Sequence, residues 1–208
     1  MQTIDAATMR QMLNAMADKI VSSRDRLNEI DAGIGDADHG TGMAQSFAKA
    51  RDKLAAVEEE DISKELKAFG MGILGGGGGA SGALFSGLFT EGGKLMSEKK
   101  EMTPAELASW WQAGLAMVVA RGKAKAGDKT MVDALEPAVA ALIEDAPKGF
   151  GEQLSKALEA ARTGVEATKN MIGGQGRSRY AGERSLGHQD AGATSVALLF
   201  EAMVESVK

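Results

Sequence analysis

The 208-residue sequence contains no cysteine, which excludes disulfides, thiolate metal ligands and cysteine nucleophiles. Only 4% of the residues are aromatic. The formal net charge is −5, so the chain lacks the basic excess with which proteins bind nucleic acid. No apolar run approaches the roughly 18 residues of a membrane span, and the polar N-terminus does not resemble a signal peptide. We therefore expect a cytoplasmic protein that has neither nucleic acid nor membrane as a partner.

Helical periodicity is the main structural signal, because apolar residues recur at steps of three and four along most of the chain. The length fits one domain, residues 1–208, with a full hydrophobic core. Thr103, Pro104 and Glu106 give one helix a strong N-terminal capping signal. Single apolar faces and moderate connections predict an all-α antiparallel assembly around one core. Eight helices are expected, at about residues 5–28, 40–57, 61–73, 81–96, 103–118, 130–144, 152–171 and 191–207.

Glycine is abundant, at 27 residues, and it gathers in four segments between the expected helices: 33–42, 70–82, 122–127 and 173–192. The run from Gly75 to Gly79 stands directly before Ala80 and Ser81. A glycine run at the start of a helix lets backbone amides approach a phosphate closely. The alternative is a flexible connection between helices, and the run alone does not decide between the two.

Two further loops carry cationic side chains. The segment from Gly122 to Thr130 is not a P-loop, because that pattern needs lysine directly after the second glycine and Asp128 stands there. Its lysines either meet phosphates or face water. The segment from Gly173 to Gly192 has no helical period, and a long irregular loop inside a domain is typical of a functional lid. Its arginines have planar donor forks that suit phosphate: Arg177, Arg179 and Arg184.

Three carboxylates stand close together just before the second expected helix, at Asp31, Asp36 and Asp38. Mg²⁺ prefers oxygen ligands and is usually bound by a few carboxylates together with substrate phosphates. Without a cation the three charges would repel one another. The helix that follows would point unpaired amides and its positive dipole end at the phosphates. A solvated acidic turn is the alternative, whereas an EF-hand fits worse because Thr41 and Phe47 occupy its glycine and glutamate positions.

The sequence has two histidines, His39 beside the aspartates and His188 in the last glycine-containing loop. Either one is a candidate general acid/base or a candidate donor to phosphate. A structural hydrogen bond is the common alternative, and the sequence leaves the choice open.

Taken together, these motifs resemble the DhaL family, the nucleotide-binding subunit or domain of dihydroxyacetone kinases. No single motif would suffice, but four occur in the family's order along nearly the whole chain. They are Asp31 with Ile34-Gly35-Asp36-Ala37-Asp38-His39-Gly40, then Gly78 to Gly82, then Gly127 to Met131 with Asp133 and Pro137, and finally Gly182 to Asp190 with Gly192 and Ala193.

The resemblance implies an eight-helix antiparallel up-and-down barrel, with ADP or ATP held at one end by the loops between helices. It implies that Asp31, Asp36 and Asp38 bind two Mg²⁺ ions that clamp the phosphates. Catalysis would then be positioning and charge neutralisation, without an assigned catalytic side chain. The implied nucleotide contacts are His39, Gly40, Thr41, Gly42, Ala80, Ser81, Gly122, Met131, Arg177, Asp190, Ala191 and Gly192.

The resemblance also implies partner subunits. A DhaK-type subunit would bind the ketose covalently through a histidine, and a DhaM-type phospho-histidine subunit would recharge the nucleotide, which stays bound as a coenzyme. One alternative is the L subunit of an ATP-exchanging kinase for another ketose or acceptor. Another is a non-catalytic nucleotide-binding regulator, against which the intact aspartates argue. Three positions depart from the family's common residues: Gly42 replaces Asn, Arg179 a small residue and Ala191 a Pro.

Overall fold

The computed structural model describes residues 2–97 and 99–207. Within this part of the chain it contains nine α-helices and one short antiparallel pair of strands, β1 (Ile4–Asp5) with β2 (Glu101–Met102). The helices are α1 (Ala6–Ser22), α2 (Arg24–Ala32), α3 (His39–Ala55), α4 (Ile62–Gly75), α5 (Gly79–Leu95), α6 (Pro104–Gly122), α7 (Val132–Asp145), α8 (Phe150–Ala167) and α9 (Ala191–Ser206).

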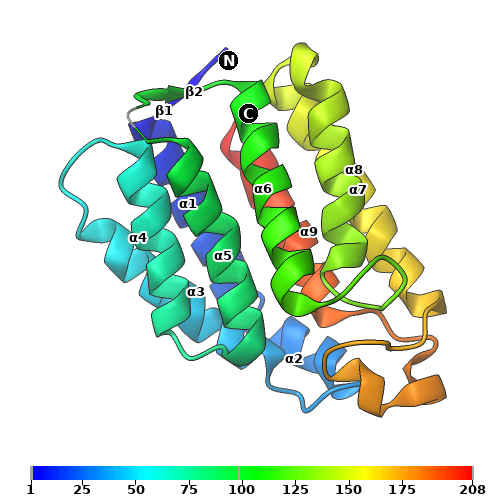
Figure 1. Ribbon diagram of the computed structural model, residues 1–208. Coiled ribbons are helices and arrows are strands. Elements are labelled where there is room, and N and C mark those ends of the chain that lie inside the picture. The colour runs from blue at the N-terminus through cyan, green and yellow to red at the C-terminus, as the bar shows by residue number, and fades with distance from the viewer. Residues whose placement is uncertain (1, 98, 208) are drawn as a thin grey trace.

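Eight of these helices form a closed antiparallel ring (Figure 1). Each of α3 to α8 packs on the next helix along the chain, and α9 and α3 both pack on α1 to close the circle. The two short strands lie at one end of the ring, whereas the loops after α2, α4 and α6 and the segment between α8 and α9 lie at the other. The expected eight-helix barrel is thus confirmed, and four glycine-containing loops meet at one of its ends.

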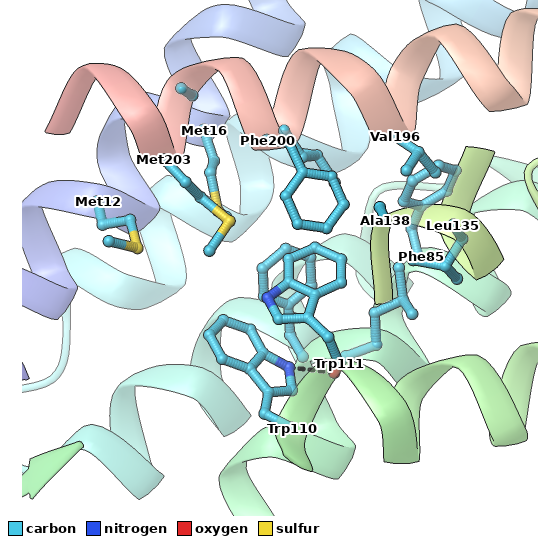
Figure 2. Close-up of a cluster of buried hydrophobic side chains, with 14 of the residues drawn as sticks. Met12, Met16, Phe85, Trp110, Trp111, Leu135, Ala138, Val196, Phe200 and Met203 are labelled. Carbon is cyan, nitrogen blue, oxygen red and sulfur yellow. Dashed lines mark hydrogen bonds between the residues drawn. The ribbon is translucent and has the colours of Figure 1, made fainter. Parts of the chain in front are cut away.

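Aromatic and methionine side chains fill the centre of the ring (Figure 2). Trp111 of α6 reaches across to Phe200 of α9, with ring centroids 4.6 Å apart. Trp110 stacks on Trp111 and donates a 2.6 Å hydrogen bond from Nε1 to the Leu88 carbonyl. Although the chain has few aromatic residues, most of them are concentrated here, and their burial supplies a large share of the core's apolar area.

The prediction of a single helix over residues 5–28 is wrong in one respect, because two helices, α1 and α2, occupy this region. The chain leaves α1 at Ser23, whose amide still bonds to the Lys19 and Ile20 carbonyls, and it then enters α2. The break makes room for α3, since a Cβ at Gly40 would lie 2.0 Å from the Arg24 carbonyl oxygen. The extra helix α2 is therefore the element that carries Asp31 to the loop end of the barrel.

The other expected helices are found, most of them with ends shifted by a few residues, and the eighth begins at Ala191 as expected. The capping box expected at the start of α6 is present, with Thr103 and Glu106 bonded to each other's backbone amides. Among the described residues, no helix is both long enough and apolar enough to cross a membrane.

Candidate metal and phosphate site

The three aspartates predicted as metal ligands lie together at the loop end of the barrel. Asp31, Asp36 and Asp38 each offer one carboxylate oxygen, and these oxygens lie within 4.8 Å of one another. Asp31 is buried at the end of α2, whereas Asp36 and Asp38 are exposed on the turn that follows. Three hard oxygen donors at this spacing suit a divalent cation such as Mg²⁺.

Backbone contacts fix the position of Asp31. Its Oδ2 accepts hydrogen bonds from the amides of Asp38, at 3.1 Å, and His39, at 3.3 Å. Its carbonyl accepts the Gly35 amide at 2.6 Å, which folds the turn back on the end of α2. A Cβ at Gly35 would lie 2.1 Å from Asp31 Oδ1, so only glycine fits beside this carboxylate. The Gly35-Asp36 motif therefore positions a metal-ligating residue four positions earlier in the chain.

Repulsion between the three carboxylates affects the pKa of Asp38. Loss of solvation is the main cause that raises the pKa of Asp38, followed by a hydrogen bond that its protonated form donates to the Asp36 carboxylate and by the charges of Asp36 and Asp31. Arg177 forms a 2.9 Å ion pair with Asp36 and so ties the segment between α8 and α9 to the aspartate turn. A bound cation would relieve the remaining repulsion between the carboxylates.

Two cavities meet at this cluster. A cavity of about 440 Å³ extends into the barrel end between α5, α6 and α7, and its walls are mainly apolar. A second cavity, of about 600 Å³, lies over the three aspartates and the glycine run. Both are lined by Asp31, His39, Ala80, Ser81, Gly176 and Arg177. An apolar chamber joined to a polar one fits a ligand with a planar apolar part and a charged chain.

The start of α5, rather than that of α3, offers amides to such a ligand. In α3, the amides of Asp38 and His39 donate to Asp31 and that of Thr41 donates to Asn28 at 2.9 Å. The expectation that α3 presents unpaired amides is therefore wrong for these three groups. The first turn of α5 has no side-chain cap, and its Ala80 and Ser81 line both cavities. Helix N-termini with unpaired amides bind anions.

The two histidines differ in their position relative to the cavities. His39 lines both cavities, and its Nε2 lies 2.9 Å from the Ser195 hydroxyl oxygen of α9. Burial lowers the pKa of His39, which favours the neutral form of its ring, although the charge of Asp31 opposes this shift. His188 lines neither cavity, and its ring packs against Gly33, where a Cβ would lie 2.5 Å from its Nδ1. Of the two candidates, only His39 is placed to contact a ligand.

Lys129 differs from the other lysines of its loop. Lys123 and Lys125 are exposed, as the water-facing alternative expects. Lys129 is fully buried and donates from Nζ to the carbonyls of Thr168 and His188. It thereby joins the loop before α7 to the segment before α9. Desolvation lowers its pKa, although the nearby Asp190 and Asp133 carboxylates oppose this shift.

Asp190 lines the apolar cavity and caps α9, where its Oδ2 accepts the Ala193 amide at 2.7 Å. Loss of solvation is the main cause that raises the pKa of this carboxyl from 3.8 to about 7. The neighbouring Asp133 is engaged elsewhere, since it accepts the Gly127 and Thr130 amides at 2.6 and 2.8 Å.

The structure brings together most of the residues that the sequence singled out. Gly122, Met131, Asp190, Ala191 and Gly192 line the apolar cavity, and Thr41 and Gly42 line the polar one. Gly40 lines neither cavity and instead lies against α2.

Several lining residues were missed by the sequence reasoning. The apolar walls include Leu84 and Val118, which periodicity could only assign to helix faces. Gln45 lines the polar cavity, and nothing in its local sequence marks it as a site residue. Gly176 lines both cavities, and the sequence pointed only to the 173–192 segment that contains it.

Comparisons with known proteins agree with this arrangement. Residues 33–205 match the family model of the DAK2 domain. The chain is 36% identical over 198 residues to the PEP-dependent dihydroxyacetone kinase ADP-binding subunit DhaL of Escherichia coli, covering 94% of each chain. It is 32% identical to the L-erythrulose kinase of Pectobacterium atrosepticum, covering 92% of this chain but 33% of that protein. The chain belongs to the DAK2-domain family, and its resemblance to DhaL subunits is confirmed.

A solved structure shares the fold. The dihydroxyacetone kinase from C. freundii, in complex with AMP-PNP and Mg²⁺, matches with a TM-score of 0.78 and 27% sequence identity. The match covers 99% of this chain and 35% of that one, so this chain spans about a third of the larger kinase. The barrel therefore has the same fold as the DhaL-like part of that kinase.

Proposed function

We propose that this chain is the nucleotide-binding phosphoryl-transfer subunit of a dihydroxyacetone kinase. It would act as one domain that holds ADP or ATP with Mg²⁺ and passes the terminal phosphoryl group to dihydroxyacetone on a separate DhaK-type subunit. A DhaM-type phospho-histidine subunit would recharge the bound nucleotide. The observation that carries the proposal is the aspartate cluster, whose carboxylate oxygens lie within 4.8 Å of one another where an apolar and a polar cavity meet.

The donor set fits the metal. Asp31, Asp36 and Asp38 supply only carboxylate oxygens, which Mg²⁺ prefers, and the polar cavity leaves space beside them for phosphates. When bound, Mg²⁺ would neutralise phosphate charge and orient the group to be transferred. We propose two ions, since three carboxylates and a phosphate chain offer enough oxygens to share between them.

The chain's own residues would do the positioning. The base would lie in the apolar cavity, against Leu84 and Met131. The uncapped first turn of α5 would bind phosphate oxygens through the amides at Ala80 and Ser81. Arg177 lines both cavities and carries a charge that suits a phosphate. Catalysis by such a site rests on orientation and charge neutralisation.

The ketose that accepts the phosphoryl group would be bound by a partner subunit. The cytoplasmic location remains a prediction from the sequence. A relative that acts on L-erythrulose supports a second candidate, the same transfer to another ketose. In that case the nucleotide would exchange as ATP, and the acceptor would again be chosen outside this barrel.

The test is to dialyse the purified protein extensively with Mg²⁺, denature it and identify the released nucleotide by chromatography. Near-stoichiometric ADP is the expected result, because a recharged coenzyme must stay bound. A protein that is empty but binds ATP reversibly would favour the ATP-exchanging kinase. A protein that binds no nucleotide at any Mg²⁺ concentration would contradict both.

A further inference from the structure

Arg179 lies on the polar cavity alone. It lines the polar cavity over the three aspartates but not the apolar cavity, whereas Arg177 lines both. The ion pairs of the described residues include Arg177 with Asp36 but none for Arg179. A guanidinium with no carboxylate partner, at the edge of a chamber suited to phosphates, has its charge available for an anion.

The two joined cavities define the orientation in which a nucleotide would bind. Its base belongs in the apolar chamber, and its phosphates must then pass the residues common to both chambers, among them Asp31 and Ser81. The phosphate farthest from the base would lie in the part of the polar chamber that is not shared. Gln45, Arg179 and Tyr180 line that part.

Tyr180 holds the Arg179 side chain. The guanidinium carbon lies 4.6 Å from the centre of the Tyr180 ring, and Nη2 donates a hydrogen bond to the Tyr180 hydroxyl. Both residues are exposed, so the ring restrains a side chain that would otherwise move freely in water. A restrained guanidinium loses less entropy when it binds a phosphate.

We propose that Arg179, held by Tyr180, binds the terminal phosphate of the nucleotide and makes this subunit favour a nucleoside triphosphate over a diphosphate. The inference rests on the proposed function, since it requires a nucleotide in the joined cavities. It adds a residue that discriminates between the charged and discharged forms of that nucleotide. One hydrogen bond between Arg179 and the terminal phosphate, at an exposed site, would make binding of the triphosphate about tenfold tighter than binding of the diphosphate.

The experiment measures two dissociation constants with Mg²⁺ present, one for ADP and one for a non-hydrolysable ATP analogue. Bound nucleotide is first removed by dialysis against EDTA. Replacing Arg179 with serine (Arg179→Ser) is expected to weaken binding of the ATP analogue about tenfold and to leave ADP binding nearly unchanged. A role in folding alone would weaken both ligands together.

Arg184→Ser is the matched control, because Arg184 is an exposed arginine of the same segment that lies outside the polar cavity. It is expected to change neither constant by more than about twofold. An equal loss for both ligands in Arg179→Ser, or no loss for either, would overturn the inference while leaving nucleotide binding intact. Failure of the unaltered protein to bind either ligand would overturn the proposed function as well.

A double-mutant cycle tests the part played by Tyr180. Tyr180→Ala should weaken binding of the ATP analogue in the same direction as Arg179→Ser, and the double variant should lose little more than Arg179→Ser alone. Losses that multiply in the double variant would show that Tyr180 does not act through Arg179.

Discussion

A Cβ atom at position 35 would lie 2.1 Å from Oδ1 of Asp31, so Gly35 leaves the space that the Asp31 carboxylate occupies. The same carboxylate accepts the amides of Asp38 and His39. Glycine at position 35 and the backbone of the turn together set the orientation of the one buried member of the aspartate cluster.

Gly35→Ala should therefore displace the Asp31 carboxylate and weaken Mg²⁺-dependent nucleotide binding by about tenfold or more, as loss of a supporting contact does at other metal sites. Titration of ADP into the protein at fixed Mg²⁺ measures the change. Gly75→Ala is the control, because a Cβ there meets nothing within 4 Å. Equal affinities for the two variants would refute the steric argument.

Lys129 should contribute to stability rather than to ligand binding. Lys129→Met removes the buried donor to the Thr168 and His188 carbonyls and is expected to lower the free energy of unfolding by about 2–4 kcal/mol. Urea denaturation measures this difference. The exposed Lys125 provides the control, since Lys125→Met should change stability by no more than about 0.5 kcal/mol. A phosphate-binding role for Lys129 would instead leave stability unchanged.

Asp190 should make the protein without nucleotide or metal less stable as pH rises. Its carboxyl has a pKa of 3.8 when unfolded and about 7 when folded, so between these values the folded state holds the extra proton. Unfolding free energy therefore falls across this window. Asp190→Asn keeps an acceptor for the α9 cap and should remove part of that fall, about 1–3 kcal/mol. Urea denaturation at pH 5 and pH 8, in EDTA, would show identical pH slopes if the argument is wrong.

The sequence predicted much of this architecture because helical periodicity and capping are local signals. The eight-helix ring follows from apolar faces, and Thr103 with Glu106 marks the start of α6 correctly. The aspartate cluster was predictable too, because its three members lie within eight residues of one another and the turn brings them together.

Long-range contacts account for what the sequence did not predict. The break at Ser23 depends on the approach of Gly40 to the Arg24 carbonyl, which only the fold creates. In the sequence, Lys129 cannot be told from its exposed neighbours Lys123 and Lys125, because the Thr168 and His188 carbonyls that bind its side chain lie far along the chain. The Thr41 amide of α3 was expected to be unpaired, because its acceptor on Asn28 lies 13 residues earlier along the chain.

The most direct test of the central claim is a calorimetric titration of ADP into nucleotide-free protein, with Mg²⁺ and with EDTA, for the unaltered chain and for Asp36→Asn. Asp25→Asn is the control, since Asp25 is likewise an exposed carboxylate paired with an arginine. We expect the unaltered chain and the control to bind ADP only with Mg²⁺, and Asp36→Asn to bind it at least about tenfold more weakly. Tight binding in EDTA, or an Asp36→Asn variant as tight as the control, would contradict the account.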